Sequence, residues 1–469
     1  MVTREIGQQA SGARPNEYER DDPHDRRARL AAWACRATER ISRVHAVTCY
    51  GRVEHVTATL IVARLPRCAI GHLCALTAPE LGAPSTLAEV IGFDAKHALL
   101  APLGPIEGIE PRSFIRTLGV PHCVRVGAHL LGQSLDGFGR PMQPGAPRAE
   151  ATSTRRRVLA PAPAATERPA MFERLVTGVR AIDALTTLAR GQRVGLFAGP
   201  GCGKTTLLAA LARGIEADVV VLALVGERGR ELNAFREREL DASLSRRTVI
   251  VCSTSDTAPM ERARAAFTAT AIAEGFCEGG KHVLLLVDSL TRLARAQREI
   301  GLAANEPPGR LGYPPSVYAM LPRLIERAGN RADGSITAIY TVLTETDQAD
   351  PIGDEARSLL DAHIVLSRKL ADSGQFPAID VASSLSRLMP EIASEPHRRD
   401  AERARALLAR YADFEWLRSL GEYEPGHDAS VDAAFAHYPR LAELISQDIR
   451  TPARWEDTLE RLHAAVSAP

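Results

Sequence analysis

The sequence lacks several features that would assign it to other classes of protein. No window approaches 18 consecutive apolar residues, and the amino-terminal residues contain no apolar segment of the signal-peptide kind. We therefore expect neither a membrane-spanning helix nor a secretory leader. Aromatic residues make up only 5% of the chain, the formal net charge is +1, and no run of five or six like charges occurs. We expect no nucleic-acid partner.

Cysteine is present, but not in the spacing that binds zinc. The eight cysteines form no CxxC motif, and the nearest two, Cys68 and Cys74, are separated by five residues. Another, Cys202, lies inside a glycine-rich loop whose geometry a disulfide would disrupt. We expect free thiols, a reducing cytoplasmic compartment and no zinc site.

The glycine-rich loop lies in the stretch RVGLFAGPGCGKTT, residues 193–206. An apolar strand-like run precedes it and the helix-like LLAALARGI follows it. Glycines let backbone N–H groups converge on a phosphate at the positive end of that helix. We expect Lys204 to reach the β- and γ-phosphates of ATP and Thr205 to hold Mg²⁺. The predicted nucleotide-binding positions here are Gly199, Pro200, Gly201, Cys202, Gly203, Lys204, Thr205 and Thr206. Ala198 replaces the glycine of the strict pattern, and a turn that binds nothing is the alternative.

The periodicity of the apolar residues divides the 469-residue chain into a tail and three domains. Residues 1–30 are polar and aperiodic, which is typical of a disordered or partner-binding tail. Over 26–44 an apolar helical face lies beside a stripe of arginines. That helix could bind a partner, lie on an acidic membrane or pack on the chain's own barrel. Short β-type runs over 31–112 predict a small antiparallel barrel that lacks the basic and aromatic pattern of nucleic-acid binding.

Over 113–387, after a connector rich in proline, alanine and arginine at 145–170, β-type runs alternate with helical patterns. This alternation predicts an α/β core with a mostly parallel sheet, which binds ligands at the carboxyl ends of its strands. From 388 to 469 the pattern is helical, which predicts a separate domain. The core strands that we expect are 194–198, 219–225, 248–253, 283–287, 337–344 and 363–367.

Two acidic residues follow predicted buried strands. Asp288 follows five apolar residues, where an enzyme with a phosphate loop holds Mg²⁺; the alternative is a helix cap. Glu227, at the end of the strand 219–225, could polarise the water that attacks the γ-phosphate, and Arg228 could contact that phosphate. The alternative for this pair is a helix start with surface charges.

Several long motifs resemble one family. They read GPGCGKTT, GERGREL, LLLVDSLTRLARAQREI, PPGRLGYPPSVYAMLPRLIERAG, DEARSLLDAHIVLSR and FPAIDVASSLSR. Together, and over about 50–449, they resemble the ATPase of type III secretion systems, which includes the flagellar export ATPase. That family is similar to the catalytic subunit of rotary ATP synthases.

The resemblance implies a RecA-like core and a role for each matching residue. Lys204 and Thr205 become the phosphate and Mg²⁺ ligands, Asp288 the Walker B aspartate and Glu227 the catalytic carboxylate. Phe376 takes the place of the aromatic residue that stacks on adenine. Arg387 matches an arginine finger supplied across a subunit boundary, with Arg357 as a lower-ranked candidate.

The resemblance also implies partners and a location. It implies a homohexameric ring, stator and central-stalk proteins, chaperone–effector complexes, and peripheral association with the inner face of the bacterial inner membrane. An injectisome is favoured over a flagellum. Gln133 departs from the arginine that is more usual in the family, and the extension before Ala31 is longer than usual.

Three other functions share parts of this pattern. The segment PPSVYAMLPRLIERAG argues against a rotary ATP synthase catalytic subunit. A ring helicase of the transcription-termination type would need RNA-binding aromatic residues in the barrel. A non-catalytic ring subunit would not need a carboxylate at Glu227.

Overall fold

A computed structural model describes residues 30–31, 33–35, 37–38, 49–77, 86–94, 96–147, 149–150, 152–344 and 350–467. The chain divides into two units, Met1–Cys49 and Tyr50–Pro469. In the first unit, the described residues between 30 and 38 are helical, within the helix predicted for 26–44. The rest of that helix, and residues 1–29 of the predicted tail, lie outside the described residues.

The second unit begins with a closed barrel whose strands follow the order β1-β2-β5-β4-β3-β6. Neighbouring strands are antiparallel, and the fully buried side chains of Ile61, Leu76 and Leu100 fill the interior. The sequence analysis ends the barrel at residue 112 and so leaves out its last strand, β6. It does so because Arg116 and Gly119 interrupt the apolar pattern of this strand. The strands are β1 (Tyr50–Val56), β2 (Ile61–Arg64), β3 (His72–Thr77), β4 (Thr86–Asp94), β5 (His97–Pro102) and β6 (Phe114–Pro121).

A buried ion pair joins the barrel to the core. Glu89 of β4 and Arg264 of α6 (Pro259–Cys277) are 2% and 7% exposed. The guanidinium donates to both carboxylate oxygens, at 3.1 Å from Nε and 2.5 Å from Nη2. Because each charge would be costly to bury alone, this pair fixes the barrel at one position on α6.

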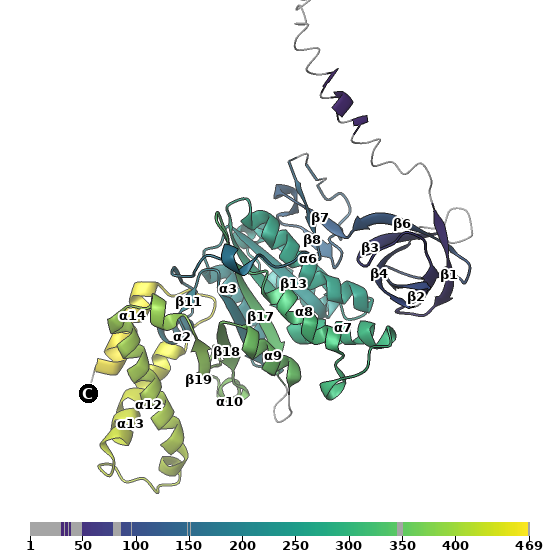
Figure 1. The fold of residues 1–469 in the computed structure, drawn as a ribbon. Coiled ribbons are helices and arrows are strands. Elements are labelled where there is room, and N and C mark those ends of the chain that lie inside the picture. Colours follow the sequence, from purple (N-terminus) through teal and green to yellow (C-terminus); the bar gives the residue numbers. More distant parts are fainter. Residues whose placement is uncertain are drawn as a thin grey trace, which may run out of the picture. The chain divides into compact units, whose positions relative to one another are not determined.

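The core is a mostly parallel sheet of strand order β19-β18-β12-β17-β15-β13-β14-β8, with β16 paired to β17 (Figure 1). The pairs β18–β19 and β16–β17 are antiparallel, and the other pairs are parallel. The α/β prediction is confirmed. The strands are β8 (Ser134–Asp136), β12 (Arg193–Ala198), β13 (Val219–Glu227), β14 (Thr248–Thr254), β15 (His282–Asp288), β16 (Gly329–Asn330), β17 (Ser335–Leu343), β18 (Ala362–Leu366) and β19 (Ile379–Ser386).

The core strands bury both of their faces. In β13, the side chains of Val221 and Ala223 belong to one hydrophobic cluster, and those of Val220 and Leu222 to another. Alternate residues of a strand point to opposite faces, so a strand between two helical layers is apolar throughout. The helices of the core are α2 (Arg180–Leu185), α3 (Lys204–Gly214), α4 (Gly229–Arg238), α5 (Ala242–Arg246), α6, α7 (Leu290–Ala303), α8 (Pro315–Ile325), α9 (Pro351–Leu359) and α10 (Arg368–Asp372).

Two strands at the ends of the sheet are missing from the sequence analysis. The antiparallel β19 exposes part of one face and contains several serines, so it has no continuous apolar run. The strand β8 is only three residues long. Short elements link the barrel to the core: β7 (Cys123–Val126), η1 (Ala128–Leu130), β9 (Thr154–Arg157), η2 (Ala165–Glu167), β10 (Arg174–Leu175) and β11 (Leu188–Ala189), while η3 (Arg310–Gly312) precedes α8.

The carboxyl-terminal domain is helical, as predicted. It consists of α11 (Met389–Ile392), α12 (Glu395–Ser419), α13 (Ala429–Ile445) and α14 (Trp455–Ser467). The last three helices pack on one another and on α2, and Figure 1 shows the hairpin of α12 and α13 extending away from the sheet. None of the helices within the described residues has the length and apolar character needed to cross a membrane.

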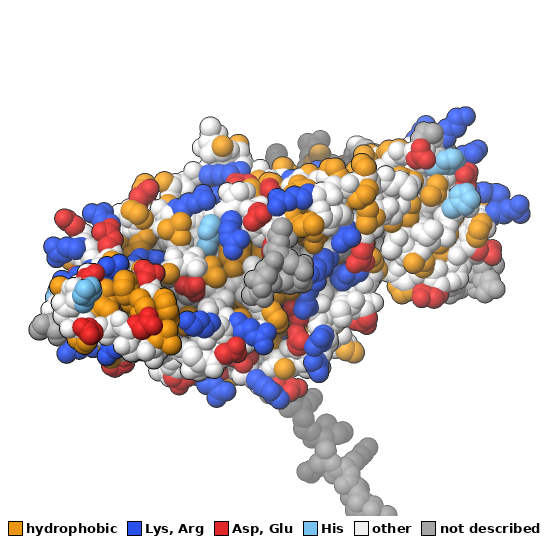
Figure 2. Space-filling model, turned by 90° about the horizontal axis from the view of Figure 1, so that it is seen from below, with side chains coloured by type: hydrophobic (Ala, Val, Ile, Leu, Met, Phe, Trp, Pro, Cys, Tyr) orange, Lys and Arg blue, Asp and Glu red, His pale blue; other side chains and the backbone are white. Residues whose placement is uncertain are grey.

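The surface carries charges of both signs. Figure 2 shows lysine and arginine side chains interspersed with aspartate and glutamate over one face of the molecule. The net charge of the whole chain is only +1 because 58 lysine and arginine residues are balanced by 57 aspartate and glutamate residues.

Candidate functional site

The phosphate loop, residues 199–203, joins β12 to α3. Gly201 and Gly203 have φ angles of 80° and 81°, and Gly203 immediately precedes the helix. Only glycine adopts this left-handed conformation at little cost, so these two positions require it. The first turn of α3 directs its free N–H groups toward the loop, where a phosphate would accept them.

Three side chains meet at the carboxyl ends of neighbouring strands. Lys204 Nζ lies 2.5 Å from Asp288 Oδ1 and 3.5 Å from Glu227 Oε1. Asp288 ends β15 and Glu227 ends β13, so the parallel pairing of these strands brings both carboxylates to the same edge. The structure thus brings Lys204 together with the two carboxylates.

Asp288 is 3% exposed and is held from two sides. Lys204 and the hydroxyl of Thr341 (2.6 Å) both donate to its Oδ1. Asp288 is not a helix cap, because the side chain of Ser289 accepts the backbone N–H of Arg292 at the start of α7. The carboxylate is therefore fixed by side chains rather than by the helix that follows it.

Glu227 is 4% exposed, so it is not a surface charge. Gly226, with a φ of 64°, produces a register shift between β13 and β14 immediately before Glu227. Arg292 Nη1 lies 2.8 Å from Glu227 Oε2 and also donates to the carbonyl oxygen of Gly226. Burial, with smaller effects of Glu231 and Asp288, raises the pKa of Glu227 to about 7, although Lys204 and Arg292 oppose the shift.

This raised pKa predicts the pH dependence of hydrolysis. Only the ionised carboxylate can accept a proton from the attacking water. Glu227 is protonated below its pKa of about 7, so we expect kcat to rise with pH through about 7 and then to level off. Steady-state kinetics in buffers of constant ionic strength measure this, with nucleotide affinity as the control. A kcat that is constant across this range would contradict the role of Glu227 as the base.

The side chains of Thr205 and Asp288 fit a magnesium ion whose other ligands come from a nucleotide and water. Within the described residues, no group of three His, Cys, Asp or Glu side chains could hold a metal ion alone. Magnesium in ATPases takes one or two protein ligands and completes its shell with phosphate oxygens and water. Asp288, held through Oδ1, and the exposed hydroxyl residue Thr205 meet this requirement.

A cavity of about 200 Å³ lies beside the phosphate loop. Phe376, which is 48% exposed, lines this cavity together with Cys202 and Gly203 of the loop and Thr206 of α3. The chain thus brings the predicted adenine-stacking residue to the phosphate loop. Ile449, beyond α13, also lines the cavity, and the backbone N–H of Gln447 donates to the carbonyl oxygen of Phe376 (2.8 Å).

The predicted arginines do not gather around Lys204. Arg228 has a 64% exposed side chain, whose nearest ion-pair partner among the described residues is Glu231 at 3.9 Å. Arg387 follows β19, and its backbone N–H donates to the carbonyl oxygen of Asp361 (3.0 Å), beside Arg193. The phosphate loop begins at the other end of β12, roughly 20 Å away. Arg357 lies close to Arg387, with its guanidinium 4.5 Å from the ring centre of Phe197.

The sequence analysis missed Arg292, Thr341 and Ile449. A threonine inside the apolar strand β17 and an arginine one turn after Asp288 are weak signals of a functional role. Ile449 gives no signal, because its place beside the loop depends on how the carboxyl-terminal domain folds back.

Comparisons with known proteins identify the family. Residues 178–386 match the nucleotide-binding domain of the ATP synthase alpha/beta family, and residues 393–464 match the T3SS EscN ATPase C-terminal domain. The chain is 51% identical over 440 residues to the type 3 secretion system ATPase of Pseudomonas syringae pv. syringae, covering 93% of this chain and 98% of that protein. The chain belongs to the type 3 secretion system ATPase family. It is therefore an ATP-binding hydrolase of type III secretion.

Other relatives of this ATPase agree with the assignment. The flagellum-specific ATP synthase of Salmonella typhimurium is 44% identical over 430 residues, covering 89% of this chain and 93% of that protein. The structure of the assembled ATPase EscN from enteropathogenic E. coli has a TM-score of 0.83 at 44% identity, covering 89% of this chain and 100% of that chain. EscN in complex with its central stalk EscO has a TM-score of 0.81 at 43% identity, with the same coverage.

Proposed function

We propose that this protein is the Mg²⁺-dependent ATPase of an injectisome and acts as a homohexameric ring in which neighbouring subunits share each active site. The observation that carries the proposal is the separation of two sets of residues in the core. Lys204, Asp288 and Glu227 meet at the carboxyl ends of the strands, whereas Arg387 lies near the amino end of β12. An arginine in that position is better placed to serve a phosphate of another subunit than the phosphate bound by its own chain.

The chemistry follows from this division. Glu227 accepts a proton from the water that attacks the γ-phosphate, and Arg292 holds its second oxygen in place. Lys204 and Arg228 of the same chain, and Arg387 of a neighbour, neutralise charge on the γ-phosphate oxygens. Arg228 has to turn inward from its exposed position when ATP binds. Phe376 stacks on adenine. A bound Mg²⁺, held by Thr205 and Asp288, would supply further neutralisation of the phosphate charge.

The helical hairpin of α12 and α13 suits a partner that binds at its tip. Trp416 and Leu420, near the end of α12, are 57% and 63% exposed. Large exposed apolar side chains at a tip favour a contact with another protein. We assign this tip to a central stalk, in line with the complex of EscN with EscO. We also propose that stator proteins and chaperone–effector complexes bind this protein, and that it lies in the cytoplasm at the inner face of the inner membrane.

We propose that the secretion system is an injectisome rather than a flagellum. The Pseudomonas type 3 secretion system ATPase is 51% identical to this chain, and the Salmonella flagellum-specific protein 44%. We expect this chain to restore effector secretion to Pseudomonas syringae lacking its own type 3 secretion ATPase. We expect it not to restore swimming to Salmonella lacking the flagellum-specific protein. Secretion assays and motility plates measure the two outcomes at matched expression, with Lys204→Ala as the control. Recovered swimming without secretion would contradict the injectisome assignment.

A further inference from the structure

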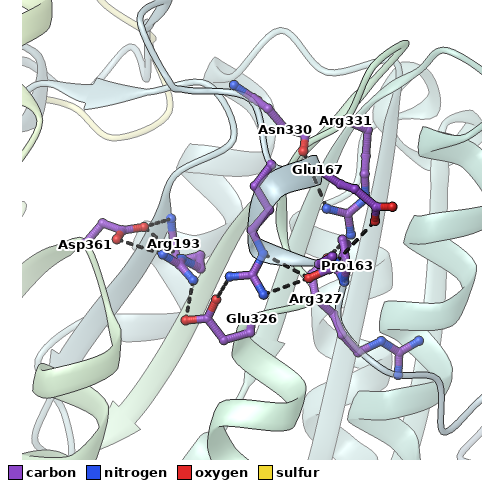
Figure 3. Close-up of polar contacts among 10 residues, drawn as sticks. Pro163, Glu167, Arg193, Glu326, Arg327, Asn330, Arg331 and Asp361 are labelled. Carbon is purple, nitrogen blue, oxygen red and sulfur yellow. Dashed lines mark hydrogen bonds and ion pairs between the residues drawn. The ribbon is translucent and has the colours of Figure 1, made fainter.

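A pair of charged side chains holds the amino end of the strand that leads to the phosphate loop. Arg193, the first residue of β12, donates to both carboxylate oxygens of Asp361, at 2.9 Å from Nε and 3.1 Å from Nη2 (Figure 3). Its backbone N–H also donates to Asp361 Oδ2 (3.1 Å). The two side chains are 16% and 21% exposed. A bidentate pair of this kind fixes relative orientation as well as distance.

The backbone of Asp361 is hydrogen-bonded to the segment that carries Arg387. The backbone N–H of Arg387 donates to the carbonyl oxygen of Asp361 (3.0 Å), and the backbone N–H of Asp361 donates to the carbonyl oxygen of Arg193 (2.9 Å). The next residue, Ala362, pairs with Ser386 in the antiparallel ladder of β18 and β19. The peptide of Asp361 therefore stands between the first residue of β12 and the backbone of Arg387.

A second carboxylate keeps Arg193 from moving. Glu326 Oε1 lies 2.7 Å from Arg193 Nη1, and the other oxygen of Glu326 accepts a hydrogen bond from Arg168 of the connector (Figure 3 shows the Arg193 contact). Burial disfavours the charge of Arg193, but Asp361 and Glu326 outweigh that effect and raise its pKa. The guanidinium therefore keeps its positive charge, and both carboxylates attract it.

The strand β12 connects this cluster to the nucleotide site. Its residues from 194 to 198 are buried, and it pairs with β17 on one side and β18 on the other. Close-packed interiors have low compressibility and transmit strain. A tilt of β12 that follows a change at the phosphate loop would therefore reach Arg193 and Asp361.

We propose that Asp361 is a positioning residue for Arg387. Through the Arg193–Asp361 pair, the position of the arginine that a subunit offers to its neighbour depends on β12, the strand that leads to the subunit's own phosphate loop. This inference rests on the proposed function of Arg387 in a neighbouring site. It predicts that Asp361 acts on the site of the neighbour, through Arg387, and not on the phosphate loop of its own chain.

The first test is Asp361→Asn in the full-length protein. We expect kcat to fall about 10- to 100-fold, because a displacement of about 1 Å in a positioning group can cost that much. KM for ATP and ring assembly should stay within twofold of the wild type. The matched control is Asp372→Asn, which breaks an exposed pair with Arg368. If Asp361→Asn does not fold, Arg193→Lys keeps the charge, removes the bidentate contact and takes its place. Wild-type kcat in the folded variant would overturn the proposal.

Mixed rings then decide on which site Asp361 acts. Two variants are mixed as monomers, assembled together and assayed for ATP hydrolysis. Lys204→Ala mixed with Arg387→Ala should regain activity, because one chain supplies the phosphate loop and the other the arginine. Asp361→Asn mixed with Lys204→Ala should regain activity in the same way. Asp361→Asn mixed with Arg387→Ala should not, because neither chain offers a well-placed arginine.

The opposite pattern would overturn the inference. If Asp361 served its own phosphate loop, Asp361→Asn would be rescued by Arg387→Ala and not by Lys204→Ala. The function of Arg387 is tested separately by the first mixture. If Lys204→Ala and Arg387→Ala do not complement each other, the proposal of a shared active site is contradicted, and so is the inference about Asp361. Successful complementation there, with the opposite pattern for Asp361→Asn, overturns the positioning role alone.

Discussion

Replacement of Glu227 by glutamine is expected to lower kcat by roughly 10²- to 10⁴-fold, the usual contribution of a positioned base. Glutamine keeps the shape of the side chain but cannot accept the proton of the attacking water. The phosphate loop, Lys204 and the cavity beside Phe376 are unchanged, so binding of ATP should stay close to that of the wild type. Single-turnover hydrolysis and nucleotide titration measure the two quantities. Near-normal turnover would contradict the assignment of Glu227.

The same variant should be more stable than the wild type at alkaline pH. The pKa of Glu227 is raised to about 7, so the folded state binds more protons than the unfolded state between about 4.5 and about 7. The contribution of Glu227 to stability is therefore present at acid pH and is lost as pH rises through its folded pKa. A neutral glutamine avoids that loss. We expect a higher Tm for Glu227→Gln near pH 8, and no gain near pH 4.

Replacement of Arg387 by alanine is expected to lower kcat by about 10³- to 10⁵-fold, the range for an arginine finger. The side chain is exposed in the single chain, so its loss should leave the fold and the affinity for ATP unchanged. Steady-state hydrolysis by rings, whose assembly is checked by light scattering, measures the effect.

Arg357→Ala is the matched control for Arg387→Ala. Arg357 lies on the same side of the core, but its guanidinium lies over the ring of Phe197 at 4.5 Å. We expect its loss to lower kcat less than tenfold, through packing alone. A larger loss for Arg357→Ala than for Arg387→Ala would exchange the roles of the two residues.

The fold could be predicted from the sequence wherever an element has a strong local pattern. The buried strands β12, β13 and β15 are continuous apolar runs, and the structure has them within about two residues of the predicted bounds. The strands β6, β8 and β19 were not separated from their surroundings, because they are short, exposed on one face or interrupted by polar residues. Their pairing comes from long-range contacts that no local pattern reveals.

The site follows the same rule. Lys204, Asp288 and Glu227 could be found because each follows a strand with a recognisable pattern. The contact of Arg292 with Glu227 could not, since the two residues lie on separate elements. Arg193 and Asp361 are 168 residues apart in the sequence and meet only because β12 and β18 are neighbours in the sheet.

The most direct test of the shared active site is the ATPase activity per subunit across a range of protein concentrations, with light scattering in parallel, for the wild type and Arg387→Ala. Our account predicts that the specific activity of the wild type rises as rings assemble, and that Arg387→Ala assembles equally well but stays inactive. A specific activity that does not change with concentration, together with full activity of Arg387→Ala, would place the complete site within one subunit and contradict the account.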